Sequence, residues 1–131
     1  MVASIRPFLM FQGDAAAAIA FYQSVFDGVE LRQLERYPAG QPGSEGGVRR
    51  AELVIAGQAL SVFDSPTAHA FSFTPSISLF VTCESDEEIE RLAGALVEGG
   101  QAMMPLGEYG FSRRFAWVSD RFGVSWQLNL A

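Results

Sequence analysis

Apolar and polar positions alternate in short runs along most of this chain, and two longer runs have helical spacing instead. In the first half, four segments have the short apolar or alternating pattern of a strand: 4–12, 29–37, 48–56 and 58–64. Between the first two, the run 15–26 places Ile19, Tyr22 and Phe26 on one helical face, with Asp14 as N-cap and Gly28 after its end.

The second half repeats this order of elements. The strand pattern returns in four segments: 75–83, 101–108, 111–119 and 124–130. Ser85 and Glu88 have the spacing of a capping box and begin a helix that Gly99 and Gly100 end. The repeat extends to single residues, because 49–54 matches 113–118.

Two copies of one unit predict a pseudo-two-fold domain. We expect an α+β fold in which residues 1–131 form a single domain of two βαβββ modules, 1–66 and 71–131. The Gly- and Pro-rich segment 37–47 is predicted to be a loop.

Composition narrows the class of protein. The net charge is −6 without any basic run, which argues against a nucleic-acid partner. The single cysteine, Cys83, excludes an internal disulfide and is typical of a reducing compartment. We find neither a signal-type segment nor an apolar run that spans a bilayer, so we expect a cytoplasmic protein without a membrane partner.

Strand alternation separates a helix-facing side from a second side that can line a pocket. On the last strand, Trp126 and Leu128 should pack against a helix. The predicted pocket residues from the first and last strands of the two modules are Pro7, Leu9, Phe11, Ser61, Phe63, Ser76, Ser78, Phe80, Ser125, Gln127 and Asn129. Aromatic rings mixed with small polar groups are typical of a small-molecule site. The alternative is that these polar groups only satisfy local hydrogen bonds in a filled interior.

Three charged residues on the predicted strands are candidates for chemistry. Glu52 is either a general base or the partner of an ion pair, with Arg50 or across the strands. Arg114 is either an anchor for an anionic ligand or a solvated strand end near a dimer interface. Arg50 is assigned to the pocket side together with Glu52.

The remaining candidates have structural interpretations. Asp64 and Asp120 are expected to cap turns. Cys83 is expected to be a small buried residue. We do not expect it to be a nucleophile paired with a histidine, because the chain's only histidine, His69, lies in a distant loop. The glycine-flanked segment around Tyr109 provides either a lid or interface aromatics.

Two motifs, GDAAAAIAFYQSVFDG (13–28) and FAWVSDRFGVSWQLNL (115–130), resemble the vicinal oxygen chelate superfamily. That superfamily includes glyoxalase I, extradiol dioxygenases and bleomycin resistance proteins. The second motif is most similar to the PhnB-like branch, which carries the label "3-demethylubiquinone-9 3-methyltransferase domain". The resemblance implies two modules whose mixed sheets curl around a cavity, within a bacterial homodimer.

In metal-dependent members of this superfamily, four side chains from the first and last strands of each module hold a divalent ion. The resemblance places these positions near Pro7, Ser61, Ser76 and Gln127. None of them is a histidine or a carboxylate, the ligands that divalent ions prefer, so we expect no metal and no cofactor. Gly13-Asp14 also lacks the Gly-x-Gly pattern of a nucleotide-type cofactor site.

Three functions are therefore compatible with the sequence. The first is a metal-independent small-molecule-binding protein of the vicinal oxygen chelate fold. The second is a small-metabolite enzyme of the isomerase, lyase or transferase type, with Glu52 as base and Arg114 as anion anchor. The third is a non-catalytic dimeric scaffold whose pocket is filled by its own side chains.

Overall fold

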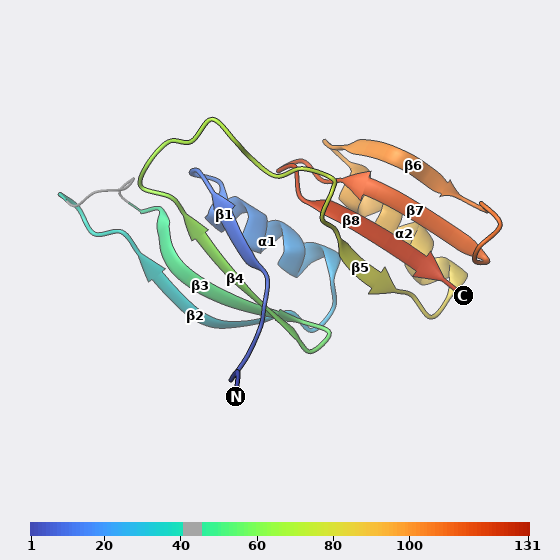
Figure 1. Cartoon of the computed structure of the whole chain (residues 1–131), viewed down its shortest axis with the longest axis horizontal. Helices are drawn as coiled ribbons and strands as arrows, with labels where there is room; N and C mark the ends of the chain where they lie inside the picture. The colour runs from blue at the N-terminus through green and yellow to red at the C-terminus, as the bar shows by residue number, and fades with distance from the viewer. Residues whose placement is uncertain (41–45) are drawn as a thin grey trace. The chain divides into compact units, whose positions relative to one another are not determined.

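The computed structural model describes residues 1–40 and 46–131, which form two compact units, Met1–Ser72 and Phe73–Ala131 (Figure 1). The first unit contains β1 (Phe8–Phe11), α1 (Ala15–Val25), β2 (Glu30–Arg36), β3 (Val48–Ile55) and β4 (Gln58–Asp64). The second unit contains β5 (Leu79–Thr82), α2 (Asp86–Val97), β6 (Gln101–Gly107), β7 (Arg114–Ser119) and β8 (Ser125–Leu130). The predicted α+β class and the repeated βαβββ order are confirmed. Part of the loop predicted over 37–47, residues 41–45, lies outside the described residues.

Both units arrange their strands in the same order. The first sheet has the order β1-β4-β3-β2 and the second the order β5-β8-β7-β6. In each, the first strand pairs in parallel with the last, and the other pairs are antiparallel. The register places Phe8 opposite Ser61 in the first sheet and Phe80 opposite Gln127 in the second. These two pairs are therefore equivalent positions of the repeat.

The core of the first unit lies between α1 and one face of its sheet, where α1 contacts β3 and β4. Leu53, Leu60 and Val62 are buried on that face, and Tyr22 of α1 is buried with them. Full burial of one such side chain contributes about 1.5–3 kcal/mol. Apolar residues at alternate strand positions thus hold the sheet to the helix and leave the opposite face free.

The start of α1 is held by a residue from the other end of the unit. Asp14 is the N-cap, but its side chain makes no capping hydrogen bond. Instead, Asp64 Oδ1 accepts the backbone N–H groups of Gly13 at 2.8 Å and Ala15 at 2.9 Å, and its Oδ2 accepts that of Val48 at 2.9 Å. Asp14 is thus the N-cap residue, as predicted, but the capping hydrogen bonds come from Asp64. The predicted role of Asp64 as a local turn cap is wrong, because its buried carboxylate caps α1 from the end of β4.

The second unit packs α2 against β7 and β8 in the same way. Trp126 and Leu128 are buried, as the alternation of the last strand predicted. Ser85 Oγ accepts the N–H of Glu88 at 3.1 Å, which confirms the predicted N-cap. The carboxylate of Glu88 reaches the N–H of Glu84 at 2.9 Å, so the return half of the capping box is displaced by one residue.

No helix in the described part of the chain is both long enough and apolar enough to cross a membrane.

Candidate functional site

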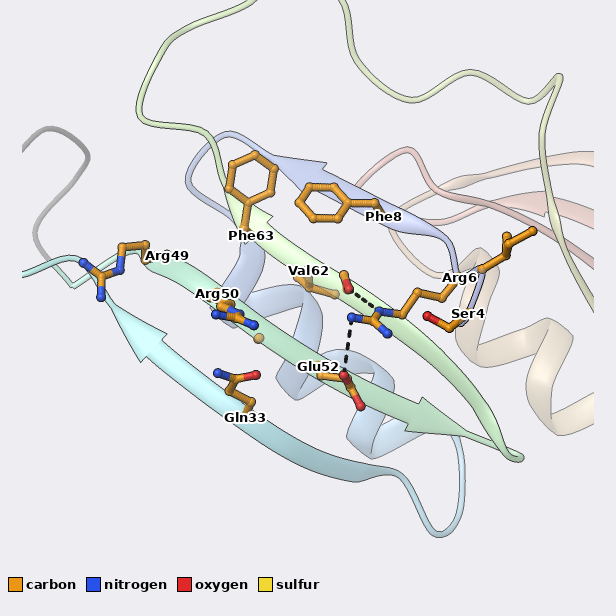
Figure 2. Close-up of a pocket in the computed structure, with 12 residues that line it drawn as sticks. Ser4, Arg6, Phe8, Gln33, Arg49, Arg50, Glu52, Val62 and Phe63 are labelled. Atoms are coloured by element: carbon orange, nitrogen blue, oxygen red, sulfur yellow. Dashed lines mark hydrogen bonds and ion pairs between the residues drawn. The ribbon is translucent and has the colours of Figure 1, made fainter. Parts of the chain in front are cut away.

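A groove of about 610 Å³ lies on the face of the first sheet that α1 leaves uncovered (Figure 2). Its walls come from the segment before β1 and from the exposed sides of the strands, and its polar lining residues include Arg6, Arg49, Arg50, Glu52 and Ser61. The alternation of β4 explains this placement: Leu60 and Val62 are buried, whereas Ser61 and Phe63 between and after them are half-buried on the open side. We call this the first-unit groove.

Three of the lining residues are arginines, and their partners differ. Arg6 Nε donates to Ser61 Oγ at 2.8 Å. Arg49 Nη2 lies 3.4 Å from a carboxylate oxygen of Glu35. Within residues 1–40 and 46–131, the side chain of Arg50 has neither an ion pair nor a hydrogen bond, and Figure 2 shows it inside the groove on β3. Its guanidinium is available to a ligand.

Glu52 is held between two guanidinium groups. Its carboxylate oxygens lie 3.9 Å from Arg6 Nη2 and 3.7 Å from Arg32 Nη1, and its side chain is 22% exposed. Arg32 belongs to β2, the strand next to β3, so the predicted cross-strand ion pair is confirmed. The partners of Glu52 in the described part of the chain are thus Arg6 and Arg32, and its other predicted partner, Arg50, is left unpaired.

The apolar wall of this groove is formed by Phe8 and Phe63. Their ring centroids lie 5.0 Å apart with the planes tilted by 57°, and Phe8 is 66% exposed. The prediction that Leu9 and Phe11 face the pocket is wrong, because both are buried on the helix side. The parallel register with β4 sets this alternation: Phe8 lies opposite Ser61, one residue away from the predicted position. Pro7 precedes β1, and its carbonyl oxygen accepts the N–H of Ser61 at 3.0 Å.

The open face of the second sheet carries a groove of about 470 Å³, which we call the second-unit groove. Phe80, Gln127 and Asn129 line it, on the side that the strand alternation predicted. Ser78 and Ser125, which were also predicted to face the pocket, are not among its lining residues. Their hydroxyl oxygens lie 2.7 Å apart, and Ser125 is buried.

Other groups in the second unit bond to these two serines. Trp117 Nε1 donates to Ser125 Oγ at 2.9 Å, and Gln127 Nε2 donates to Ser78 Oγ at 3.3 Å. Ser78 and Ser125 therefore satisfy local hydrogen bonds, as the alternative interpretation held. Ser76 is exposed before β5, with its hydroxyl oxygen 2.8 Å from that of Thr74.

Arg114 does not reach either groove. Its Nη1 lies 2.7 Å from Glu90 and 3.3 Å from Asp86, both on α2. The hydrogen bond to Glu90, reinforced by Asp86, raises the pKa of the Arg114 guanidinium above its ordinary value. The predicted role as an anion anchor in the pocket is wrong, because Arg114 shares the helix-facing side of β7 with buried Ala116.

The error has an identifiable cause in the turns between strands. Two residues separate β3 from β4, whereas five separate β7 from β8. In the sheets, Glu52 lies opposite Ser61 and Trp117 lies opposite Gln127, so Arg50 is equivalent to Phe115 and not to Arg114. The match between 49–54 and 113–118 by residue type therefore places β7 one residue out of register with β3. A shift of one residue moves every side chain of a strand to the opposite face of its sheet.

The remaining candidates have structural roles. Burial, and then the negative charge of Glu88, raise the pKa of the Cys83 thiol to about 11, which removes it as a nucleophile at neutral pH. Asp120 Oδ1 accepts the N–H groups of Phe122 and Val124 at 2.9 and 3.1 Å, which confirms the predicted turn cap. His69 Nε2 lies 3.1 Å from Ser65 Oγ, and its ring stacks on Phe71.

The residues at the superfamily's metal positions do not fit a divalent ion. With the register of the two sheets, the open-face pairs are Phe8 with Ser61 and Phe80 with Gln127. Two phenylalanines, a hydroxyl and an amide supply no carboxylate and no imidazole. In the described residues, moreover, no group of three or more His, Cys, Asp or Glu side chains is placed to hold a metal.

Comparison with known proteins establishes the family. Residues 3–129 match the family model described as 3-demethylubiquinone-9 3-methyltransferase. The chain belongs to this family. A solved PhnB protein from Bacillus cereus is 47% identical, covers 98% of this chain and 99% of its own, and superimposes with a TM-score of 0.95. Protein PA1353 from Pseudomonas aeruginosa is 30% identical over 98% of both chains, with a TM-score of 0.86.

The 3-demethylubiquinone-9 3-methyltransferase family shares its fold with a wider group. A glyoxylase/bleomycin resistance protein/dioxygenase domain from Frankia sp. EAN1pec has a TM-score of 0.70 at 14% identity, and it covers 100% of this chain and 93% of its own. At that identity the likeness concerns the fold alone. The resemblance to the PhnB-like branch is confirmed by the family model and the Bacillus cereus structure, and the glyoxalase-like fold is confirmed by the wider group.

Proposed function

We propose that this protein binds a small organic anion in the first-unit groove, without a metal ion. The observation that carries the proposal is the guanidinium of Arg50, which lies in the groove without a partner among the described residues. A guanidinium presents a planar set of donors that matches a carboxylate, phosphate or phosphonate group. Arg50 is therefore the anion contact of the proposed site.

The groove also suits the rest of such a ligand. Phe8 and Phe63 provide an apolar wall, and a volume of about 610 Å³ falls within the range of small-molecule sites. Arg6 is already bonded to Ser61, and with Glu52 it forms a neutral edge to the groove. We thus expect a ligand with one anionic group next to an aromatic or branched apolar body.

Metal independence is part of the proposal and follows from the donor set. Phe8, Ser61, Phe80 and Gln127 offer a divalent ion only one hydroxyl and one amide oxygen. Methyl transfer is not proposed, because the N–H of Ala15, the first residue of α1, and that of Gly13 before it are bonded to Asp64 and not open to a nucleotide-type cofactor. The enzyme hypothesis with Arg114 as anchor is withdrawn, since Arg114 contacts α2.

Isothermal titration calorimetry with three phenyl compounds tests the anion contact: phenylphosphonate, benzoate and neutral benzamide, which has the planar shape of benzoate without its charge. We expect the two anions to bind and benzamide to bind at least tenfold more weakly. Arg50→Met should weaken phenylphosphonate binding by about tenfold or more, because loss of one hydrogen bond between charged groups changes affinity by about this factor. Arg113→Met removes the same charge from an exposed position outside the groove and should leave affinity unchanged. Equal losses in both variants would contradict a specific site.

Two further measurements address the metal and the natural ligand. Elemental analysis of protein purified without added metal should find no stoichiometric divalent ion. An ion that is present in the wild type and lost in Gln127→Ala would overturn metal independence. Native mass spectrometry of the purified protein should show a retained anionic metabolite that is lost in Arg50→Met, and retention by that variant would count against the assigned site.

The predicted homodimer and cytoplasmic location stay predictions.

A further inference from the structure

We infer that Arg6 is a positioning residue of the anion site: by holding Glu52, it keeps the guanidinium of Arg50 available to a ligand. When Arg6 withdraws, Glu52 turns to Arg50, and the ion pair between them closes the site to anions. The segment before β1, which carries Arg6, thereby controls binding. This inference rests on the proposed anion contact at Arg50 and deepens it, and every residue that it uses belongs to the first unit.

Arg50 and Glu52 lie close enough on β3 to form an ion pair. They are two positions apart on one strand and both line the groove, so they share a face of the sheet (Figure 2). Neighbouring side chains on one face of a strand start about 6–7 Å apart, a distance that an arginine side chain can span. Yet the side chain of Arg50 has no partner among the described residues. Other groups must therefore hold the carboxylate of Glu52 away from it.

Two other arginines hold that carboxylate, and neither holds it tightly. Arg6 Nη2 lies 3.9 Å and Arg32 Nη1 lies 3.7 Å from the oxygens of Glu52, distances longer than a hydrogen bond. Arg32 is also shared, because its Nε lies 3.3 Å from Glu30. Without Arg6, Glu52 keeps only part of one positive charge. The unpaired guanidinium of Arg50 is then its better partner.

Arg6 reaches Glu52 through a residue of β4. Ser61 lies opposite Glu52 in the register of β3 and β4. Ser61 Oγ accepts Arg6 Nε at 2.8 Å, and the N–H of Ser61 donates to the carbonyl oxygen of Pro7 at 3.0 Å. The chain before β1 is in neither a helix nor a strand, and Ile5 is 89% exposed. The two bonds to Ser61 therefore hold Arg6 beside Glu52, and a displacement of this segment removes Arg6 from it.

A second carboxylate near Arg50 provides a matched control. Glu35 lies opposite Arg50 in the register of β2 and β3, and Arg49 Nη2 lies 3.4 Å from one of its oxygens. Removal of Arg6 therefore releases Glu52 and leaves Glu35 with its partner. A general loss of positive charge from the groove does not distinguish the two carboxylates, whereas the positioning role of Arg6 concerns Glu52 alone.

The Nε–H signal of Arg50 reports its pairing directly, without any ligand. In NMR spectra of ¹⁵N-labelled protein in slightly acidic buffer, this signal is assigned by its absence from Arg50→Met. We expect Arg6→Gln to move it, and the further change Glu52→Gln to return it to its wild-type position. Adding Glu35→Gln instead should not return it. A signal that ignores Arg6→Gln, or that Glu35→Gln restores equally well, would overturn the inference.

The affinity for phenylphosphonate, measured by calorimetry, tests the consequence for binding. Arg6→Gln should weaken it about threefold, since a partly exposed ion pair must break before the ligand binds. Glu52→Gln should recover this loss in the Arg6→Gln background and raise the affinity clearly less in the wild-type background. Equal gains in the two backgrounds would show a general charge effect and contradict the role of Arg6. Arg32→Gln repeats the test from the other side of Glu52, with circular dichroism to confirm that each variant is folded.

The two assays separate this inference from the anion site on which it rests. If phenylphosphonate binding depends on Arg50 but the Arg50 signal does not respond to Arg6→Gln, only the role of Arg6 is refuted. If the signal responds but Arg50→Met binds phenylphosphonate as tightly as the wild type, the anion contact is refuted, and with it the effect of Arg6 on binding.

Discussion

The carboxylate of Asp64 accepts the backbone N–H of Ala15 at 2.9 Å, although 49 residues separate them in the chain. The same side chain accepts the N–H groups of Gly13 and Val48, and it is only 3% exposed. One residue thus joins the end of β4 to the starts of α1 and β3. The same end of β4 pairs in parallel with β1, where Phe11 lies opposite Asp64 and Phe8 opposite Ser61.

Asp64→Ala is expected to lower the free energy of unfolding by about 2–4 kcal/mol, since two buried N–H groups and one part-buried N–H group lose a charged acceptor. Urea unfolding followed by circular dichroism measures this. Asp14→Ala is the matched control: Asp14 is the N-cap residue without a side-chain cap, and its loss should cost less than about 1 kcal/mol. Equal losses in the two variants would show that Asp64 is not the cap.

Gly94, within α2, and Gly100, after its end, should respond oppositely to alanine. A Cβ on Gly100 would overlap the carbonyl oxygen of Ser119 and come within 2.8 Å of the carbonyl carbon of Asp120, so Gly100→Ala should lower the melting temperature. A Cβ on Gly94, within α2, meets nothing within 4 Å. Gly94→Ala should stabilise the protein by about 0.5–1 kcal/mol. Differential scanning calorimetry checks both, and the same sign for both would contradict this packing.

The stability of the fold should decrease in alkaline solution partly because of Cys83. Its pKa is raised to about 11 by burial, from an ordinary value near 9.0, so the thiolate forms more readily in the unfolded chain. This contribution to stability is complete below pH 9 and is lost as the pH rises toward 11. At pH 10 the loss amounts to about 1 kcal/mol. Urea unfolding at pH 8 and pH 10 should show a smaller decrease for Cys83→Ala than for the wild type. Parallel decreases would exclude this thiol as the cause.

Arg114 should matter modestly for stability and not at all for binding. It joins β7 to α2 through exposed carboxylates at Glu90 and Asp86, and water screens ion pairs of this kind. Arg114→Leu should therefore lower the urea midpoint only slightly, and less at high salt. Phenylphosphonate affinity, measured by calorimetry, should equal that of the wild type. A tenfold loss would restore Arg114 as an anion anchor.

The sequence by itself determined the elements, their repeated order and the family. Periodicity marked Ile19 and Tyr22 as buried in one helix and Trp126 and Leu128 as buried in one strand, because each pattern depends only on neighbours along the chain. The sequence also shows directly that Ser61 and Gln127, at two of the superfamily's metal positions, are neither histidine nor a carboxylate, since this depends on residue type alone.

Only the tertiary structure decided which faces the strands of the open surface present. Leu9 and Arg114 were each assigned one position away from the correct face. The register of β1 depends on its parallel pairing with β4 and that of β7 on a five-residue turn, and neither is local information. Likewise Asp64 caps α1 across 49 residues, and Arg50 is left without a described partner because Glu52 is engaged by Arg6 and Arg32. Side-chain partners are set by contacts between strands, and sequence spacing does not encode them.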